Sequence, residues 1–231
     1  MDILVVNING LSYTKDLVNC LLRQNKPYLL MIIDQASDEE GTEEYLVSLT
    51  KDHEHIKVQF NKENVPLSRL WNSHYLSSES DLICFLNNDV LVPPNFVRDT
   101  ITIFEKEPSV SCVIHATNHP RYRDMTPLQY EVLKISVTQG WDFAIRRSAY
   151  VMIPDEIKFY GGDDFLFNKF QENKWDVAIA LSSPIVHFKA KSRMYYQGNR
   201  QEESKTVIRM GIKRFPYRCA FTIPYPAKEN M

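Results

Sequence analysis

The chain has 231 residues, 44% of them hydrophobic and 24% charged, and this length is enough to bury a sizeable core in one domain. Its 27 basic and 29 acidic residues give a net charge of -2, which excludes the strongly positive surface that broad nucleic-acid binding requires. The longest apolar run, residues 28–33, is far shorter than the ~20 residues that cross a bilayer.

The amino terminus and the cysteines predict a cytoplasmic protein. Asp2 stands where a secretory signal would carry positive charge, and the apolar segment after it is too brief for such a signal. The four cysteines form neither a Cys-x-x-Cys pair nor a zinc-binding spacing, and three of them lie inside apolar patterns. Buried, reduced thiols are therefore expected.

Short apolar runs alternate with helical patterns over the first half of the chain. The apolar runs predict strands at residues 3–8, 28–33, 56–60, 81–86 and 110–115. Apolar residues at helical spacing predict helices at residues 13–24, 42–49 and 94–107, and one that begins at Pro66. Ser12 is the expected N-cap of the first helix. This alternation predicts a mostly parallel sheet covered on both faces, with functional polar residues beyond the carboxyl ends of its strands.

The second half of the chain is less regular. We expect a long loop over residues 117–139 that contains a helix at 127–134, and a second helix at 163–172. Strand-like patterns cover residues 141–146 and 176–181. After His187 the sequence turns basic, which we interpret as a solvated helix face; closure over a diphosphate and contact with an anionic membrane surface are the alternatives.

The segment from residue 81 to residue 95 carries the strongest chemical signal. Asn87, Asn88 and Asp89 follow a predicted buried strand and should lie at the edge of the sheet. Two prolines, at 93 and 94, then precede the next predicted helix. Since the chain has no Gly-x-Gly-x-x-Gly motif and no phosphate-binding loop, a nucleotide here must be held by side chains and a metal. A carboxylate suits Mg²⁺ or Mn²⁺ carrying a diphosphate. An ordinary polar turn explains the same three residues equally well.

Five segments in the same order resemble those of family-2 glycosyltransferases with the GT-A fold, over roughly residues 2–190. They are Val-Val-Asn-Ile-Asn-Gly-Leu-Ser-Tyr (5–13), the stretch 32–46, Leu-Asn-Asn-Asp-Val (86–90), Gly-Gly-Asp-Asp-Phe (161–165) and His187 after an apolar strand.

The resemblance implies an α/β GT-A fold, with a mostly parallel central sheet flanked by helices and a small antiparallel region on the acceptor side. It implies a single domain over residues 1–190, with a nucleotide-sugar half at 1–115 and an acceptor and catalytic half at 116–190. A basic extension, residues 191–231, would pack on the site or close over it.

The nucleotide-binding positions that the resemblance implies are Val6, Ile8, Asn9, Asp34, Arg69 and Asn88. Of these, Asp34 would accept hydrogen bonds from the base and Asn88 would touch the ribose. The alternative for Asp34 is a helix or turn cap after a strand, and Arg69 could equally be a solvated helix residue.

The metal ligands that the resemblance implies are Asp89 and His187, holding Mn²⁺ or Mg²⁺ against the diphosphate. Asn87 replaces the first acid of the family's metal motif, so Asp89 is the only carboxylate of that motif in this chain. A hydrogen-bonded structural histidine at a strand end is the alternative for His187.

The resemblance implies catalytic roles for Asp164 and Asp163, with Asp164 as the general base and Asp163 at a position where the family usually has Glu. An acidic first turn favoured by the helix dipole, worth only ~0.3–1 kcal/mol, is the alternative. Trp141 and Asp142 correspond to the segment that lines the acceptor pocket, although a tryptophan of the core would give the same pattern.

The function implied is a metal-dependent, inverting transfer of a hexosyl or deoxyhexosyl group. The donor would be a UDP-, GDP- or dTDP-sugar and the acceptor a hydroxyl of a glycan, a lipid or a protein-linked sugar. Nucleic acid is not an expected partner, and any membrane contact would be peripheral. Asn87 keeps open a non-catalytic sugar-nucleotide- or carbohydrate-binding relative. A sugar-phosphate nucleotidyltransferase is the third reading, although residues 7–12 lack the Gly-rich, basic loop that it should show.

Overall fold

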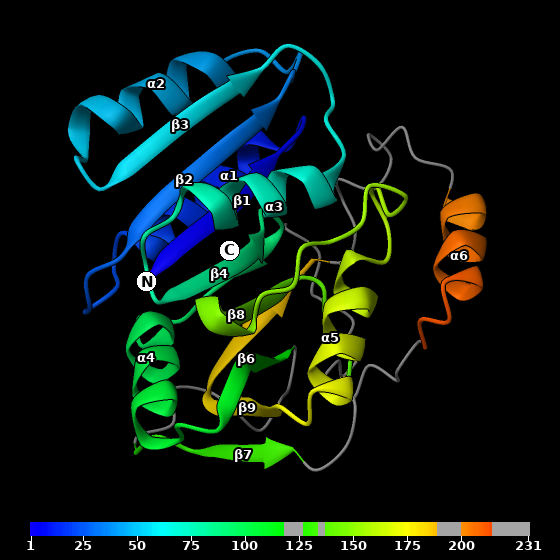
Figure 1. Ribbon diagram of the computed structural model, residues 1–231. Helices are drawn as coiled ribbons and strands as arrows, with labels where there is room; N and C mark the ends of the chain where they lie inside the picture. Colours follow the sequence, from blue (N-terminus) through cyan, green and yellow to red (C-terminus); the bar gives the residue numbers. More distant parts are fainter. Residues whose placement is uncertain (118–126, 134–136, 189–199, 214–231) are drawn as a thin grey trace.

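The computed structural model describes residues 1–117, 127–133, 137–188 and 200–213, and Figure 1 shows a central sheet with helices on both of its faces. In chain order the elements are β1 (Asp2–Asn7), α1 (Leu11–Leu21), β2 (Leu29–Gln35), α2 (Thr42–Asp52), β3 (Ile56–Asn61), α3 (Leu67–Ser77), β4 (Leu82–Asn87), β5 (Val90–Leu91), α4 (Phe96–Lys106), β6 (Val110–Thr117), β7 (Tyr130–Leu133), β8 (Asp142–Arg146), the 3-10 helix η1 (Arg147–Ala149), α5 (Gly162–Glu172), β9 (Asp176–His187) and α6 (Arg200–Arg209).

The strands pair in the order β3-β2-β1-β4-β8-β6-β9-β5, and β7 also pairs with β9. The strands β3, β2, β1 and β4 are parallel neighbours, whereas β8 runs antiparallel between β4 and β6. Beyond it, β6 and β9 are parallel, and β5 and β7 run antiparallel to β9. This arrangement confirms the expected mostly parallel α/β sheet, with its antiparallel strands in the second half of the chain.

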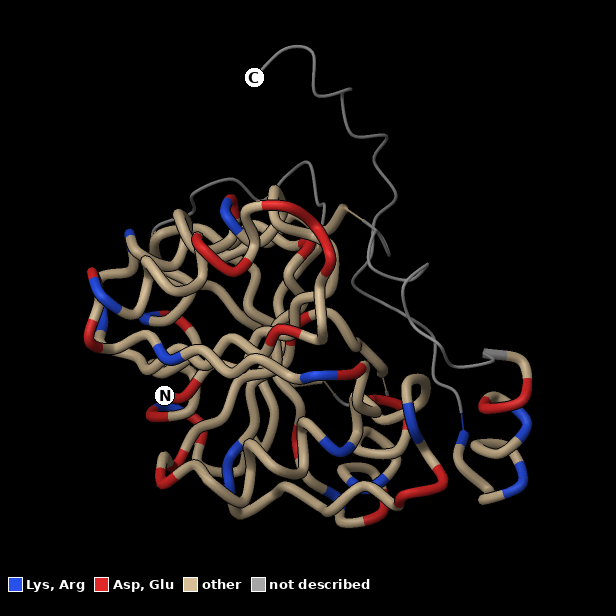
Figure 2. The backbone as a smooth tube through the Cα atoms, turned by 90° about the horizontal axis from the view of Figure 1, so that it is seen from above, with Lys and Arg blue, Asp and Glu red and all other residues tan. Residues whose placement is uncertain are grey.

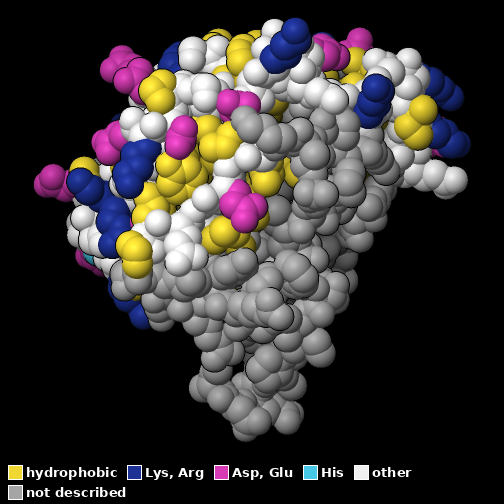
Figure 3. Space-filling model, turned by 90° about the horizontal axis from the view of Figure 1, so that it is seen from below, with side chains coloured by type: hydrophobic (Ala, Val, Ile, Leu, Met, Phe, Trp, Pro, Cys, Tyr) yellow, Lys and Arg dark blue, Asp and Glu magenta, His cyan; other side chains and the backbone are white. Residues whose placement is uncertain are grey.

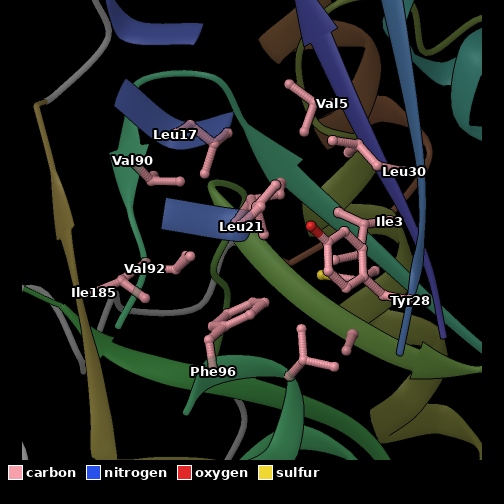
Figure 4. Packing of buried hydrophobic residues seen from close by; sticks show 14 of the residues in the cluster. Ile3, Val5, Leu17, Leu21, Tyr28, Leu30, Val90, Val92, Phe96 and Ile185 are labelled. Atoms are coloured by element: carbon pink, nitrogen blue, oxygen red, sulfur yellow. The ribbon is translucent and has the colours of Figure 1, made fainter. Parts of the chain in front are cut away.

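Alternate side chains of the central strands enter two hydrophobic clusters. Ile3 and Val5 of β1 pack in the cluster formed with α1, α2 and α4, while Leu4 and Val6 pack in the cluster formed with α3 and α5. The alternation follows from the pleat of a strand, which points successive side chains to opposite faces. In Figure 4, side chains from β1, α1, β2 and the start of α4 converge on the interior of the first cluster.

The first helix begins earlier than predicted, and Ser12 is not its N-cap. The N-cap is Gly10, whose carbonyl accepts the first helical hydrogen bond from the Thr14 N–H at 2.9 Å. The Glu39 carboxylate accepts the Leu11 N–H at 2.8 Å, so a residue from another loop does what Ser12 was expected to do.

The helix predicted over residues 127–134 is also wrong, because the described residues 127–133 contain the strand β7. Its register pairs Tyr130 with Ala180 and Leu133 with Val177 of β9. Tyr130 and Val132 pack against the first hydrophobic cluster, and aromatic and β-branched side chains suit such a pleated, half-buried surface. Residue 134 lies outside the described residues.

The last strand is longer than predicted, since β9 continues from residue 181 to His187. Its pairing with β6 is irregular, because the partner of β6 shifts from Ala180 at His115 to Ile185 at Thr117. After this irregularity, β9 pairs with the two-residue strand β5, which was not predicted. The long strand therefore brings His187 to the residues that follow β4.

Two of the cysteines are buried free thiols, as the sequence suggested. Cys84 and Cys112 lie in the core, and burial raises the pKa of both thiols well above the ordinary value. Cys20 is a half-buried free thiol, and Cys219 lies outside the described residues. No helix in the described part of the chain has the length and apolar character to cross a membrane.

The charged residues are mixed on the surface. Figure 2 shows acidic and basic positions following one another along the backbone, and on the face in Figure 3 hydrophobic side chains lie among charged ones of both signs. This mixture agrees with the small net charge of -2.

Replacing Phe85 by alanine should lower the free energy of unfolding by about 3–5 kcal/mol, because the change leaves a cavity in the second cluster. The ring is 2% exposed and lies 5.1 Å from the rings of both Trp71 and Phe143, measured between centroids. Chemical denaturation measures the change. Leu76→Ala, at a side chain that is 64% exposed, is the control and should cost less than about 0.5 kcal/mol. Equal costs would contradict this packing.

Candidate active site

The carboxyl ends of β1, β2 and β4 lie next to one another at one edge of the sheet. The register pairs Asn7 with Asp34 and Val6 with Asn87. Because these strands are parallel, the polar residues that follow each of them emerge on the same side. Asn88 and Asp89 come directly after β4 and are buried there.

Hydrogen bonds join these strand ends into one polar network. Asn7 Nδ2 donates to Asp34 Oδ1 at 2.7 Å, while Asn7 Oδ1 accepts from Asn88 Nδ2 at 3.1 Å. Thr14 of α1 also donates to Asn7 Oδ1, at 2.8 Å, and accepts from Asn88 Nδ2 at 3.2 Å. The network fixes the positions of Asp34 and Asn88 relative to each other. These are the two residues that the sequence placed at the base and at the ribose of a nucleoside.

The loop after β2 folds back onto Asp34. The carboxylate of Asp34 accepts the backbone N–H and the hydroxyl of Ser37, at 3.0 and 2.6 Å. The side chain of Asn9 caps the same loop, because its Oδ1 accepts the backbone N–H groups of Asp38 and Glu39 at 2.9 and 3.2 Å. Asp34 thus caps the turn after β2, which was the alternative expected for it. Asn9, which follows β1, caps the same turn from the neighbouring loop.

Glycine at position 10 lets the chain approach Asn88 closely. A Cβ on Gly10 would lie 2.5 Å from Asn88 Nδ2, which is too short for any real contact. Val6 and Ile8 on the same stretch are 8% and 6% exposed, so at this edge they offer only a small apolar surface.

Asp89 and His187 meet where β5 pairs with the end of β9. His187 Nε2 lies 3.4 Å from Asp89 Oδ1, and the pairing places Val90 opposite His187. The Phe188 N–H also donates to the Asp89 carbonyl at 2.9 Å, which ties the two segments together. The two residues named from the sequence as metal ligands are therefore neighbours.

The chemistry of this pair fits a divalent cation that also binds a ligand. Carboxylate oxygen and imidazole nitrogen both bind Mn²⁺-type ions, and two protein ligands leave coordination positions for diphosphate oxygens and water. Within the described residues no cluster of three or more His, Cys, Asp or Glu forms a complete protein site. These two side chains therefore suit a metal ion whose remaining coordination positions are filled by a bound diphosphate and water.

Trp141 covers His187. The indole and imidazole rings are stacked, with 5.0 Å between their centroids and 16° between their planes. The indole N–H donates to Thr117 Oγ1 at 2.9 Å, so the ring is held by the strand β6 behind it. Trp141 is partly buried.

Asp142, the residue after Trp141, points into the core. Its carboxylate accepts the backbone N–H of His115 at 3.1 Å, lies 2.8 Å from His115 Nδ1, and accepts a short hydrogen bond from Gln139 Nε2. Burial raises the pKa of the Asp142 carboxyl above its ordinary value, while the hydrogen bond and the charge of His115 act in the opposite direction. Asp142 is 0% exposed and is enclosed by His115 and Gln139, so it presents no surface to an acceptor.

The acidic pair lies at the start of α5, beside the loop that carries Trp141. Asp163 and Asp164 occupy the first turn, where the helix dipole favours negative charge, and Asp164 is 6% exposed. The Asp163 carboxylate lies so close to Gly140 that a Cβ on this glycine would overlap with it. Since Gly140 precedes Trp141, Asp163 lies beside the loop that carries the aromatic ring, and Asp164 is the next residue of the same helical turn.

A continuous set of contacts therefore crosses the carboxyl edge of the sheet. Its members, in order, are Asp34, Asn7, Asn88–Asp89, His187, Trp141–Gly140 and Asp163–Asp164. Arg69 is not joined to it by the contacts of the described residues: its guanidinium forms an exposed ion pair with Asp155 at 3.0 Å.

Asn7 was expected among the polar residues at the strand ends, but several residues that build this edge were not singled out in the sequence. Ser37 bonds to Asp34, Thr14 bonds to Asn7, and His115 and Gln139 hold Asp142. A polar residue that ends an apolar strand, as His115 does, is a signal that could have found one of them.

Comparison with known proteins points to one family. The chain matches the family model described as Glycosyl transferase family 2 over residues 2–172. A direct comparison with curated proteins gives no match.

Solved structures with similar backbones include S. aureus TarS 1–349, with 13% identity, a TM-score of 0.68 and coverage of 90% of this chain and 63% of that chain. GalNAc-T7, solved with UDP, GalNAc and Mn²⁺, gives 14% identity, a TM-score of 0.70 and coverage of 89% and 47%. TarS 1–349 in complex with UDP-GlcNAc gives 11% identity and a TM-score of 0.66, with coverage of 89% and 64%. This chain thus spans about half to just under two thirds of those chains, and the likeness shows the fold.

Replacing His115 by alanine should lower the free energy of unfolding by about 1–3 kcal/mol, because the buried Asp142 carboxyl loses its side-chain partner at Oδ2 and keeps only Gln139 and the backbone N–H of residue 115. In that background Asp142→Ala should cost less than it does in the wild type, which a double-mutant cycle by chemical denaturation measures. Additive costs, within about 0.5 kcal/mol, would show that the two side chains do not act as a pair.

Proposed function

Because the chain belongs to glycosyl transferase family 2 and has the GT-A fold, we propose that it is a metal-dependent, inverting glycosyltransferase. It moves a hexosyl or deoxyhexosyl group from a nucleoside-diphosphate sugar to a hydroxyl acceptor. The observation that carries this proposal is the continuous set of contacts from Asp34 to Asp164, since it joins donor-side, metal-side and acid–base residues from distant parts of the chain.

In this proposal the nucleoside binds between Asp34 and Asn88. The base lies beside Val6 and Ile8 and donates hydrogen bonds to Asp34, and the ribose touches Asn88. The support is that Asn7 couples these two polar side chains through bonds of 2.7 and 3.1 Å. The TarS neighbours were solved with UDP or UDP-GlcNAc, so uridine donors are the first to test.

Asp89 and His187 hold the divalent cation at the diphosphate. Mn²⁺ is the first candidate, because the GalNAc-T7 neighbour was solved with it. When bound, the cation stabilises the negative charge that develops on the leaving diphosphate. The single carboxylate of the Asn87-Asn88-Asp89 sequence makes metal affinity depend on the diphosphate oxygens that complete the coordination.

Asp164 acts as the general base. The acceptor hydroxyl attacks the anomeric carbon, its proton passes to the Asp164 carboxylate, and the bond from that carbon to the diphosphate oxygen breaks on the opposite face. The carboxylate must remain ionised to accept the proton, and its place in the first turn of α5 favours the charged form. Asp163 lies next to it, against Gly140, and orients the acceptor side.

Trp141 forms the floor of the acceptor side, because an aromatic face packs well on the C–H surface of a sugar. In this proposal residues 1–115 serve the donor, and residues 116–190 serve the acceptor and supply His187 to the cation. We do not extend the proposal to a direct contact of Asp142 with the acceptor, since its carboxylate is enclosed by His115 and Gln139.

Replacing Asp164 by asparagine should lower kcat by about 10²–10⁴-fold and leave donor binding almost unchanged, because the change removes only the proton acceptor. Transfer from UDP-sugars in the presence of Mn²⁺, with calorimetry of UDP binding, measures both quantities. Asp176→Asn, at a half-buried side chain that accepts a hydrogen bond from Ser109 at 2.8 Å at the start of β9, is the control and should be fully active. Full activity of Asp164→Asn would remove the base from the proposal; binding without turnover in the wild type would favour the non-catalytic relative.

Removal of divalent cations with a chelator should abolish transfer, and added Mn²⁺ should restore it. Asp89→Asn should lower both the metal affinity in the presence of UDP and kcat, because one of the two protein ligands loses its charge. Calorimetry of Mn²⁺ binding with UDP present checks this independently of turnover. Unchanged transfer in the chelator would contradict the metal requirement.

A further inference from the structure

The helix α6 lies beside the part of the molecule that carries α5 (Figure 1) and has residues of both charges (Figure 2). Most of its described positions are exposed, as expected of a solvated helix face, but Val207 is 0% exposed. Glu203 lies four residues before Val207 and therefore on the same face. A helix of ten residues is marginal by itself in water, so this face must supply the stability of α6.

Glu203 binds the loop that leads into α5. Its Oε2 accepts the backbone N–H groups of Phe159 and Tyr160, both at 2.8 Å. Hydrogen bonds from N–H groups to a charged carboxylate are roughly twice as strong as neutral ones. A side chain of the C-terminal helix thus caps the two residues that precede Gly161, Gly162 and the acidic pair.

Gly161 allows this loop to lie directly against α6. Its φ is +92°, and a Cβ there would lie 2.5 Å from Val207 Cγ2. The next residue, Gly162, is close to Trp71 of α3, with 3.1 Å between the ideal Cβ position and the indole ring. The start of α5 is therefore enclosed between α3 on one side and α6 on the other.

A second connection reaches α5 from the residues after α6. The side-chain amide of Asn168 donates to the Lys213 carbonyl at 2.5 Å and accepts the Lys213 N–H at 3.0 Å. The same amide nitrogen donates to the Asp164 carbonyl at 2.7 Å. One buried side chain therefore links the C-terminal segment directly to the backbone of Asp164.

We propose that residues 200–213 are part of the active site's architecture, and that Glu203 is a positioning residue that holds the loop before α5 and thereby the carboxylates of Asp163 and Asp164. The catalytic consequence rests on the proposed function. Glu203 itself touches the loop and not the reacting groups, so its loss misplaces the acidic pair without removing it.

The test is Glu203→Ala in the full chain, with Glu172→Ala as the matched control, because alanine removes the single oxygen that accepts both N–H groups. Glu172 lies at the far end of α5, is exposed, and pairs only with Lys169 at 2.6 Å among the contacts described. For Glu203→Ala we expect kcat to fall about 10- to 100-fold, since a displacement of about 1 Å costs rates of this order. The donor KM should stay within about twofold, because ground-state binding of the donor is untouched. The control should behave as the wild type.

Hydrogen exchange at the amides of Phe159 and Tyr160 provides a readout independent of activity. These amides should exchange faster in Glu203→Ala and stay protected in the control. Unchanged protection would overturn the proposal, and so would full kcat with the amides deprotected. If the wild type transfers no sugar, the proposed function fails, and the exchange result alone decides whether α6 holds the loop.

Discussion

The parallel pairing of β1 with β2 and β4 is the constraint on which the rest of the molecule depends. It brings three polar strand ends to one edge of the sheet, where Asn7, Asp34 and Asn88 are almost completely buried. Buried polar groups are tolerated only when they are hydrogen-bonded, and Asn7 satisfies this need by bonding to both neighbours at once. The relative positions of these three side chains are therefore fixed by the hydrogen bonds that their burial requires.

The second half of the chain reaches the same edge by different means. The antiparallel strand β8 inserts between β4 and β6, and its first residue, Asp142, is fixed in the core by His115. The long strand β9 passes an irregularity and delivers His187 to Asp89. Trp141, which directly precedes β8, stacks on this histidine at the end of β9.

Local patterns predicted most of the fold, because strands and amphipathic helices in the first half each have a clear period. They failed where a distant partner decides the structure. Residues 130–133 form a strand because they pair with β9. Glu39, from another loop, accepts the N–H at the start of the first helix, where Ser12 was expected to be the cap. The candidate residues were found through their order along the chain. Their supporting partners lie far away in the sequence: His115 and Asp142 are 27 residues apart, so no local pattern predicts their contact.

The contact between Gly161 and Val207 limits how this sequence can diverge. Position 161 needs a left-handed backbone and has no room for a Cβ, while position 207 fills the space directly against it. Any side chain at position 161 would therefore be strained even if a smaller residue stood at 207, and a smaller residue at 207 would open a void beside the loop. Homologues that retain the helix should keep the glycine and a residue of similar volume at 207, and those that have lost the helix should still keep the glycine wherever the loop has the same backbone.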